Sequence, residues 1–143
     1  MSIEEVQQEI IEEFQFIDDW QERYEHLIAL GREMPPMPEE VKDNSKLVKG
    51  CQSNVWMDAK LEDNLLKFTA DSDAILPKGI AALLVRIYSG QSPENILQSN
   101  ESFISEIGLQ EFLSPTRANG LLAMIKQIKF YAIAYQAKMR RNA

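Results

Sequence analysis

The sequence has few of the side chains that build metal and redox sites. Its 143 residues include one cysteine, Cys51, and one histidine, His26. One cysteine excludes an intramolecular disulfide, a cysteine-based zinc site and a self-contained iron–sulfur cluster site. It is typical of a protein from a reducing compartment, so we expect a cytoplasmic location. Any chemistry of the chain alone must use one thiol, carboxylates, hydroxyls or backbone groups.

Long apolar runs and basic charge are also scarce. No run of about 18 apolar residues is present, so no membrane span is predicted, and the acidic start of the chain does not resemble a secretory signal. Lysine and arginine total 15 against 22 acidic residues, a net charge of −7. This balance argues against nucleic acid as a partner, because such binding depends on neutralising phosphates. A hydrophobic content of 45% predicts one folded domain over residues 1–143.

The N-terminal part is predicted to form two helices within residues 3–30, because apolar side chains recur there at steps of three and four. The first set is Ile3, Val6, Ile10, Phe14 and Ile17, and the second is Trp20, Tyr24, Leu27 and Ile28. Asp18 is a candidate N-cap of the second helix, and Gly31 is a candidate stop. Three prolines in residues 34–38 predict an extended connector, since proline lacks an N–H and fixes φ.

The apolar period changes to two between residues 46 and 71, as in β-strands. Val55, Met57 and Ala59 alternate with Trp56, Asp58 and Lys60, and Leu66, Phe68 and Ala70 alternate with Lys67, Thr69 and Asp71. Turn-forming residues at 62–64 separate the two runs, which predicts an antiparallel pair. A third short strand is expected near residues 46–49, and Trp56 is expected in the core or on a sheet face.

Helical spacing returns after Pro77 and continues to Gly90. Short helices are predicted from Ser92-Pro93 and over residues 101–107. Ser114-Pro115 combines an N-cap hydroxyl with proline at the first helical position, which predicts the start of a long final helix. The predicted fold class is α+β, with a small three-stranded antiparallel sheet and helices packed on one face.

The cysteine lies on a loop that leads into the first predicted strand. Gly50 permits backbone angles closed to other residues, and Gln52 and Ser53 are polar and tolerant of turns. Loops on rigid scaffolds often carry reactive groups, although unpaired cysteines are also often small buried apolar residues. From these residues alone, Cys51 is either a reactive thiol or a structural one.

Further segments then show a family resemblance. The segment Gly50-Cys-Gln-Ser-Asn-Val-Trp56 resembles the cysteine loop of the SufE family of sulfur-acceptor proteins. Residues 71–74 followed by Lys78-Gly79 look like the next segment of that family, residues 113–121 like its final-helix entry, and Trp20, Tyr24 and Leu30-Gly31 like its N-terminal helix pair. The resemblance covers nearly the whole chain in the family's order, and it implies a SufE/IscU-like fold.

The resemblance implies a role in sulfur transfer, with Cys51 accepting persulfide sulfur from a PLP-dependent cysteine desulfurase of the SufS-like or CsdA-like kind. The acceptor stimulates that enzyme and passes the sulfur to an iron–sulfur cluster scaffold. It needs no metal and no cofactor of its own, since the PLP belongs to the partner, and it is an accessory protein and not a stand-alone enzyme. The alternatives are a related desulfurase system that feeds other sulfur pathways, and a non-catalytic desulfurase-binding module.

The resemblance also implies roles around the thiol. Gly50, Gln52 and Ser53 are expected to form a hinged or partner-binding loop that shields the cysteine in the free protein and swings outward on docking. Asp73 is a candidate cap for the helix after Pro77 or for the turn before it. Its family counterpart suggests instead that it helps to gate the cysteine loop or faces the partner. Arg117 lies in the first turn of the last helix, where a cation opposes the helix dipole. This mismatch favours an outward role, pairing with an acid or contacting the desulfurase.

Three other interpretations compete with a sulfur carrier. A Cys–His hydrolase would need His26 beside Cys51 and an oxyanion site, whereas we expect His26 to serve packing or the surface. An interaction module would carry a merely structural cysteine. A cluster scaffold would need several metal-binding thiolates, and one is too few unless two chains share a cluster.

Overall fold

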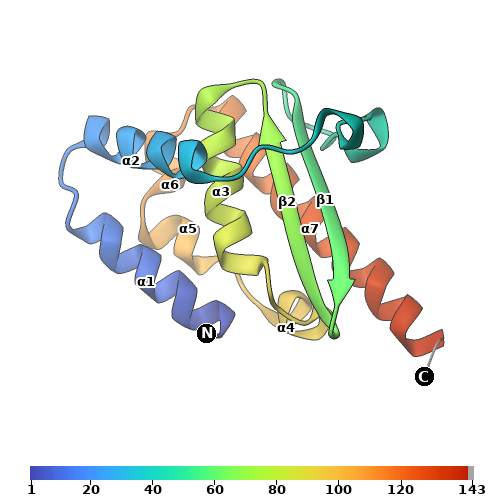
Figure 1. The fold of residues 1–143 in the computed structure, drawn as a ribbon. Helices are drawn as coiled ribbons and strands as arrows, with labels where there is room; N and C mark the ends of the chain where they lie inside the picture. The colour runs from blue at the N-terminus through green and yellow to red at the C-terminus, as the bar shows by residue number, and fades with distance from the viewer. Residues whose placement is uncertain (142–143) are drawn as a thin grey trace.

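The computed structural model describes residues 1–141 as a layer of helices packed against a small sheet (Figure 1). In chain order the helices and strands are α1 (Ile3–Gln15), α2 (Trp20–Glu33), the 3-10 turns η1 (Glu39–Val41) and η2 (Asn44–Lys46), β1 (Val55–Glu62), β2 (Leu65–Ser72), α3 (Ile75–Tyr88), α4 (Pro93–Gln98), α5 (Ser102–Glu106), α6 (Leu109–Phe112) and α7 (Pro115–Arg141). This architecture confirms the α+β class. Within residues 1–141, no helix is both long enough and apolar enough to span a membrane.

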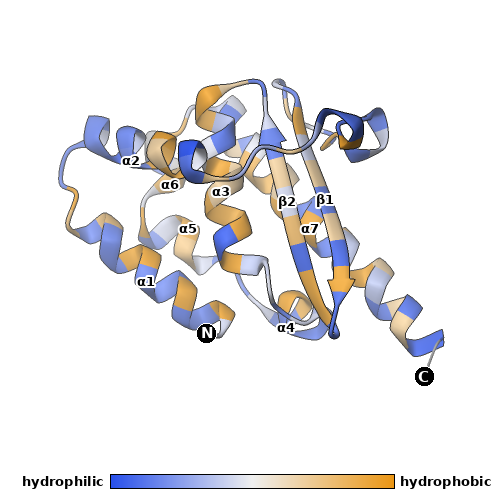
Figure 2. Cartoon of the chain, in the orientation of Figure 1, coloured by the Kyte–Doolittle hydropathy of each residue, from blue (hydrophilic) through white to orange (hydrophobic). Residues whose placement is uncertain are grey.

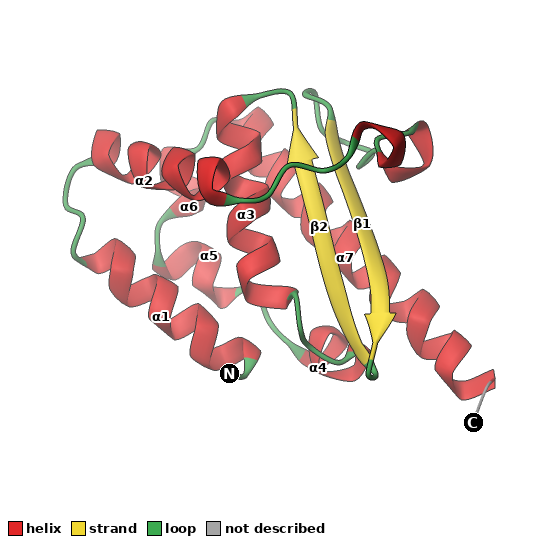
Figure 3. Ribbon diagram, viewed as in Figure 1, coloured by secondary structure: helices red, strands yellow, loops and turns green. Residues whose placement is uncertain are grey.

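The sheet of the described residues has two antiparallel strands, β1 and β2 (Figure 3). Val55 pairs with Ser72 at one end, and Glu62 with Leu65 at the other. The hairpin closes through Asp63 and Asn64 at φ 52° and 64°, left-handed values that asparagine and aspartate tolerate and that match the twist of the strands.

The predicted third strand is wrong as a full strand, because it is reduced to one bridge between Leu47 and Trp56. The physical reason lies on both sides of the bridge. Before it, Asp43 caps the tight turn η2, accepting a hydrogen bond from the backbone N of Ser45 at 2.8 Å. After it, Gly50 takes a φ of 97°, which turns the chain away from the sheet edge.

One face of the sheet is buried, as its alternating pattern predicted. The buried apolar residues of the strands are Val55, Met57, Ala59, Leu66, Phe68 and Ala70. They lie in one hydrophobic core with residues of α3 and α7, and apolar segments of these elements face one another in Figure 2. The long helix α7 is also tied to β1, because the Tyr131 and Tyr135 hydroxyls donate to the carbonyls of Met57 and Ala59, both at 2.8 Å.

The proline-rich connector crosses the other face of the sheet and leads into η1, which lies beside β1 (Figure 1). Asp71 of β2 is 3% exposed and accepts a hydrogen bond from the backbone N of Met37 at 3.0 Å. Lys42 and Lys78 lie 3.1 and 3.4 Å from the same carboxylate. Burial opposes ionisation of Asp71, but the hydrogen bonds and these lysines outweigh it, so the pKa of this carboxyl is lowered.

Several helix boundaries differ from the sequence prediction. Asp19, and not Asp18, caps α2, accepting from the backbone N of Gln21 at 3.0 Å. Of the four residues expected to be its buried stripe, only Leu27 is fully buried, and Trp20 is 45% exposed. Helix α3 begins at Ile75, before Pro77, because proline is tolerated in the first turn of a helix.

Candidate functional site

The cysteine loop runs from residue 49 to residue 54 and enters β1. Its two sides meet where the backbone N of Val48 donates to the carbonyl of Val55 at 2.8 Å. The start of β1, the end of β2 and the beginnings of α3 and α7 lie at this one edge of the molecule (Figure 1). Residues far apart in sequence therefore gather around one thiol.

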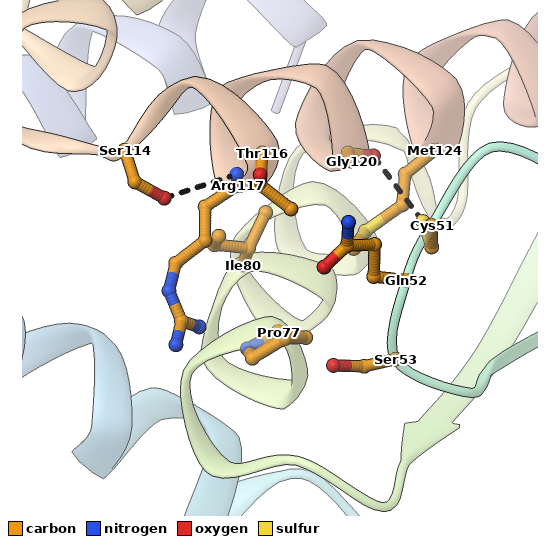
Figure 4. Close-up of a pocket in the computed structure, with 10 residues that line it drawn as sticks. All are labelled: Cys51, Gln52, Ser53, Pro77, Ile80, Ser114, Thr116, Arg117, Gly120 and Met124. Atoms are coloured by element: carbon orange, nitrogen blue, oxygen red, sulfur yellow. Dashed lines mark hydrogen bonds between the residues drawn. The ribbon is translucent and has the colours of Figure 1, made fainter.

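A pocket of about 230 Å³ opens beside the cysteine. It is lined by Cys51, Gln52, Ser53, Pro77, Ile80, Ser114, Thr116, Arg117, Gly120 and Met124 (Figure 4). The loop supplies one wall, the first turns of α3 supply the floor, and α7 supplies the opposite wall. Four of the predicted site residues, Cys51, Gln52, Ser53 and Arg117, thus line a single pocket.

The Cys51 thiol is partly buried, and its surroundings favour the neutral form. Its Sγ donates to the carbonyl oxygen of Gly120 at 3.6 Å, and its side chain packs against the hydrophobic core. Burial raises the pKa of the Cys51 thiol above its ordinary value. Because the thiolate is the reactive form of cysteine, this shift lowers the reactivity of the thiol.

Gly50 allows the loop to lie close to α7. At its φ of +97°, a side chain would be strained, and a Cβ built there would lie 3.3 Å from the Cβ of Ala123. The absence of a side chain therefore lets the cysteine loop rest against the last helix.

Asp73 forms hydrogen bonds with Asn54, the last residue of the cysteine loop. Its carboxylate accepts hydrogen bonds from the backbone N and the Nδ2 of Asn54 at 3.2 and 2.9 Å. The N-cap residue of α3 is Ala74, which has no polar side chain. The geometry therefore corrects the capping interpretation of Asp73 and places its carboxylate on the cysteine loop.

Arg117 is exposed in the first turn of α7. Its backbone N donates to the Ser114 hydroxyl at 3.3 Å, so Ser114 caps this helix as its sequence predicts. The Arg117 side chain extends from α7 toward the first turn of α3, where Pro77 lies (Figure 4). A cation thus stands at the mouth of the cysteine pocket.

His26 packs against α1 and not beside Cys51, which agrees with the predicted packing or surface role. Its Nε2 lies 3.1 Å from Oε1 of Glu13, and its ring meets the Phe14 ring edge-on with centroids 5.3 Å apart. His26 is also absent from the lining of the pocket that holds Cys51.

Trp56 lies partly buried on the outer sheet face, with the Lys42 ammonium 5.2 Å from its ring centre.

Sequence reasoning missed several pocket residues, namely Pro77, Ile80, Ser114, Thr116, Gly120 and Met124. Gly120 carried the one local signal, since an isolated glycine inside a helical pattern often marks a close approach. A Cβ built on Gly120 would lie 3.6 Å from the Cys51 sulfur. Among residues 1–141, no group of three or more His, Cys, Asp or Glu side chains is placed to hold a metal ion.

Fold and site define a small α+β protein that presents one cysteine on a closed loop. Over residues 8–132 the chain matches the SufE family, described as an Fe-S metabolism associated domain. The protein belongs to the SufE family.

Curated relatives agree with this assignment. The chain is 42% identical over 127 residues to an uncharacterized SufE-like protein of Synechocystis sp., covering 89% of this chain and 80% of the relative. It is 40% identical over 112 residues to the cysteine desulfuration protein SufE of Plasmodium vivax, covering 76% of this chain and 44% of that protein. SufE-like protein 1, chloroplastic/mitochondrial, of Arabidopsis thaliana is 39% identical over 132 residues, covering 92% of this chain and 36% of the relative.

A solved structure shares the fold. The solution structure of a hypothetical protein from Thermus thermophilus is similar with a TM-score of 0.77 at 25% sequence identity. The similarity covers 92% of this chain and 96% of that one.

Proposed function

We propose that this protein accepts sulfur from a PLP-dependent cysteine desulfurase onto Cys51 and delivers it to iron–sulfur cluster assembly. The observation that carries the proposal is the placement of the only cysteine on a loop beside a pocket, in a chain of the SufE family. The name of the Plasmodium vivax relative, a cysteine desulfuration protein, supports the same chemistry.

The transfer step is an exchange between sulfur atoms without net oxidation. The Cys51 thiolate attacks the outer sulfur of the donor's cysteine persulfide, and a new S–S bond forms. The S–S bond of the donor breaks, and the donor cysteine leaves as a thiolate. The product is a Cys51 persulfide, and the donor is ready for another turnover.

On docking, the loop releases the thiol before it reacts, and the resting geometry supports this step. In the closed loop, Cys51 donates to the Gly120 carbonyl and its burial favours the neutral form. A partner that draws the loop outward removes both restraints, which favours the thiolate. Gly50 is the hinge of this motion. Its φ is 97°, and glycine can change between positive and negative φ without the steric cost that other residues meet.

The pocket then serves the loaded form. A persulfide carries one sulfur atom beyond the Cys51 sulfur. When the loop closes again, this outer sulfur enters the pocket of about 230 Å³ beside Cys51. The chain has no second cysteine that could attack the persulfide and release sulfide. The carrier thus protects its sulfur until an acceptor, a scaffold for iron–sulfur clusters, takes it.

Mass spectrometry after incubation with a PLP-dependent desulfurase and free cysteine tests the proposal. We expect the Cys51 peptide to gain the mass of one sulfur and to lose it on treatment with a reducing thiol. Cys51→Ser is expected to bind the desulfurase but to give no stimulation. If Cys51→Ser stimulated the enzyme as well as the wild type, the protein would be a non-catalytic binding module.

A further inference from the structure

Asp71 is a buried carboxylate near the end of β2, where the strand leads toward the cysteine site. It is the next-to-last residue of the strand and pairs with Trp56 of β1, and its side chain is 5% exposed. Ser72 and Asp73, the next two residues, both bind Asn54 at the end of the cysteine loop. A shift of this strand end would therefore reach the loop.

The carboxylate is bound by donors from its own strand and from two other segments of the chain. Its Oδ2 accepts a hydrogen bond from the backbone N of Met37 at 3.0 Å and lies 3.1 Å from Nζ of Lys42. Its Oδ1 accepts from the backbone N of Ser72 at 2.8 Å and lies 3.4 Å from Nζ of Lys78. A buried carboxylate is tolerated only where such partners replace its lost hydration. Asp71 therefore joins the connector and α3 to the sheet.

Lys78 connects this carboxylate to the floor of the cysteine pocket. It lies in the first turn of α3, between Pro77 and Ile80, and both of these residues line the pocket. A cation in the first turn of a helix opposes the helix dipole, and the N-cap residue Ala74 has no polar side chain to fix the turn. The ion pair with Asp71 accounts for a lysine at this position, because it fastens the first turn of α3 to β2.

The contacts around Asp71 also reach the start of the cysteine loop. The ammonium of Lys42, its second cationic partner, lies 5.2 Å from the ring centre of Trp56. Trp56 in turn forms the bridge to Leu47, which comes shortly before the loop in the chain. The carboxylate and its partners thus contact the segments on both sides of the loop as well as the pocket floor.

We propose that Asp71 is a positioning residue for sulfur transfer, which holds the first turn of α3 through Lys78 and so keeps the pocket floor in place beneath the closed loop. This inference rests on the proposed function, because it assigns the carboxylate to the protected states of Cys51, free and loaded. Asp71 does not touch the sulfur, and docking opens the loop in any case. Weakening this tie is therefore expected to expose the thiol and the persulfide, and to leave the rate of transfer from a saturating donor unchanged.

Matched variants on α3 test the tie. Lys78→Met removes the cation but keeps a long side chain with good helix propensity, and Lys78→Arg keeps the charge and is expected to rescue. Arg86→Met is the control, because Arg86 pairs with Glu9 and Glu13 of α1 about 12 Å further along the same helix. Asp71→Asn tests the carboxylate directly. Thermal unfolding shows whether Lys78→Met and Arg86→Met lose comparable stability.

Two rates report closure of the site: alkylation of Cys51 by iodoacetamide in the free protein, and decay of the Cys51 persulfide in glutathione. For Lys78→Met we expect both rates to rise about threefold or more, and for Asp71→Asn about tenfold or more, because both of its lysine partners are lost. Lys78→Arg and Arg86→Met are expected to stay within about twofold of wild type. The rate of sulfur gain at saturating desulfurase, followed by mass spectrometry, is expected to stay within about twofold in every variant.

The outcomes separate this inference from the function on which it rests. Wild-type rates in Lys78→Met, or an equal rise in Arg86→Met, would overturn the positioning role while leaving sulfur transfer intact. If Asp71→Asn does not fold, the Lys78 variants and their control decide the question alone. A wild-type protein that gains no sulfur at any desulfurase concentration would overturn the proposed function itself, and with it the role of Asp71 in transfer.

Discussion

Asp73 and Asn54 are joined by three hydrogen bonds that fix the exit of the cysteine loop. The Asp73 carboxylate accepts from the backbone N and the Nδ2 of Asn54 at 3.2 and 2.9 Å, and the backbone N of Asp73 donates to the Asn54 carbonyl at 3.2 Å. The Ser72 hydroxyl donates to the same carbonyl at 2.7 Å. Because Asn54 is held by these bonds, we expect any movement of the loop to be confined to residues 50–54.

We expect Asp73→Asn to loosen the loop and expose the thiol. The amide has one acceptor oxygen, so it cannot take both hydrogen bonds from Asn54 in the geometry of the carboxylate. Losing one such bond weakens closure by about 1 kcal/mol, and alkylation of Cys51 by iodoacetamide in the free protein is expected to quicken about threefold to tenfold.

Asp63→Asn is the matched control for this experiment. It removes the same charge from the hairpin turn at the opposite end of the sheet, where asparagine tolerates the positive φ of 52°. Its alkylation rate is expected to equal that of the wild type. An unchanged rate in Asp73→Asn would mean that the carboxylate does not restrain the thiol.

The reactivity of Cys51 is expected to depend on pH in a way that reports the closed loop. Burial raises the pKa of this thiol, so the midpoint of its alkylation profile should lie above about 8.5, the value of a free cysteine. Saturation with desulfurase is expected to move the midpoint to lower pH, since the proposed opening of the loop removes the thiol from the Gly120 carbonyl and from its buried position. An identical midpoint with and without the partner would contradict release of the loop.

The same shift has a consequence for stability. A thiol whose pKa is higher in the folded than in the unfolded protein stabilises the fold fully below the unfolded pKa of about 8.5, and this contribution disappears as pH rises through the folded pKa. The free energy of unfolding of the wild type is therefore expected to fall more steeply above about pH 8 than that of Cys51→Ala. Urea titrations at paired pH values measure the difference between the two slopes.

Much of the scaffold was predictable because its signals are local. The alternation of Val55, Met57 and Ala59 fixed the buried face of the sheet, and Ser114-Pro115 marked the start of the last helix. The prediction of a third strand was wrong because a residue pattern does not reveal over how many residues two segments pair. Here the pairing consists of one bridge, and the chain turns away at Gly50. Sequence also missed the short helix α6, whose four residues are too few for a periodic signal.

The site was predictable only in part, since its pocket is built from three separate segments. Motif resemblance singled out Cys51, Arg117 and Asp73, but it did not reveal that the thiol donates to the Gly120 carbonyl. Nor did it identify Asn54 as the residue that Asp73 holds. These relationships depend on how α3, α7 and the loop meet in space, and no spacing along the chain encodes that meeting.

His26→Ala is expected to leave sulfur transfer unchanged and to affect stability instead. Its imidazole lies beside Glu13, which also pairs with Arg86 and so ties α1 to α3. Removing the ring loses this hydrogen bond and the edge contact with Phe14, a loss of about 1–2 kcal/mol in the free energy of unfolding. Persulfide formation on Cys51 should keep the wild-type rate, whereas abolished transfer in a folded variant would revive a Cys–His mechanism.

Two helical glycines are expected to respond in opposite ways to alanine. A Cβ on Gly79 would lie 2.6 Å from the carbonyl carbon of Leu27, and closer still to its oxygen, where α3 crosses α2. Because both contacts are with backbone, Gly79→Ala must force the helices apart, and it is expected to lose about 2–3 kcal/mol of stability.

At Gly120 the nearest atom to a new Cβ is the Cys51 sulfur at 3.6 Å, an ordinary contact. Gly120→Ala is therefore expected to keep or raise stability by up to about 1 kcal/mol, through the helix propensity of alanine. The added methyl group takes space beside the thiol, so the loaded persulfide should fit the pocket less well and lose its sulfur faster to a small thiol. Chemical unfolding measures the first effect, and the decay of the persulfide mass in glutathione measures the second. A stable Gly120→Ala protein whose persulfide decays at the wild-type rate would show that the loaded sulfur lies outside the pocket.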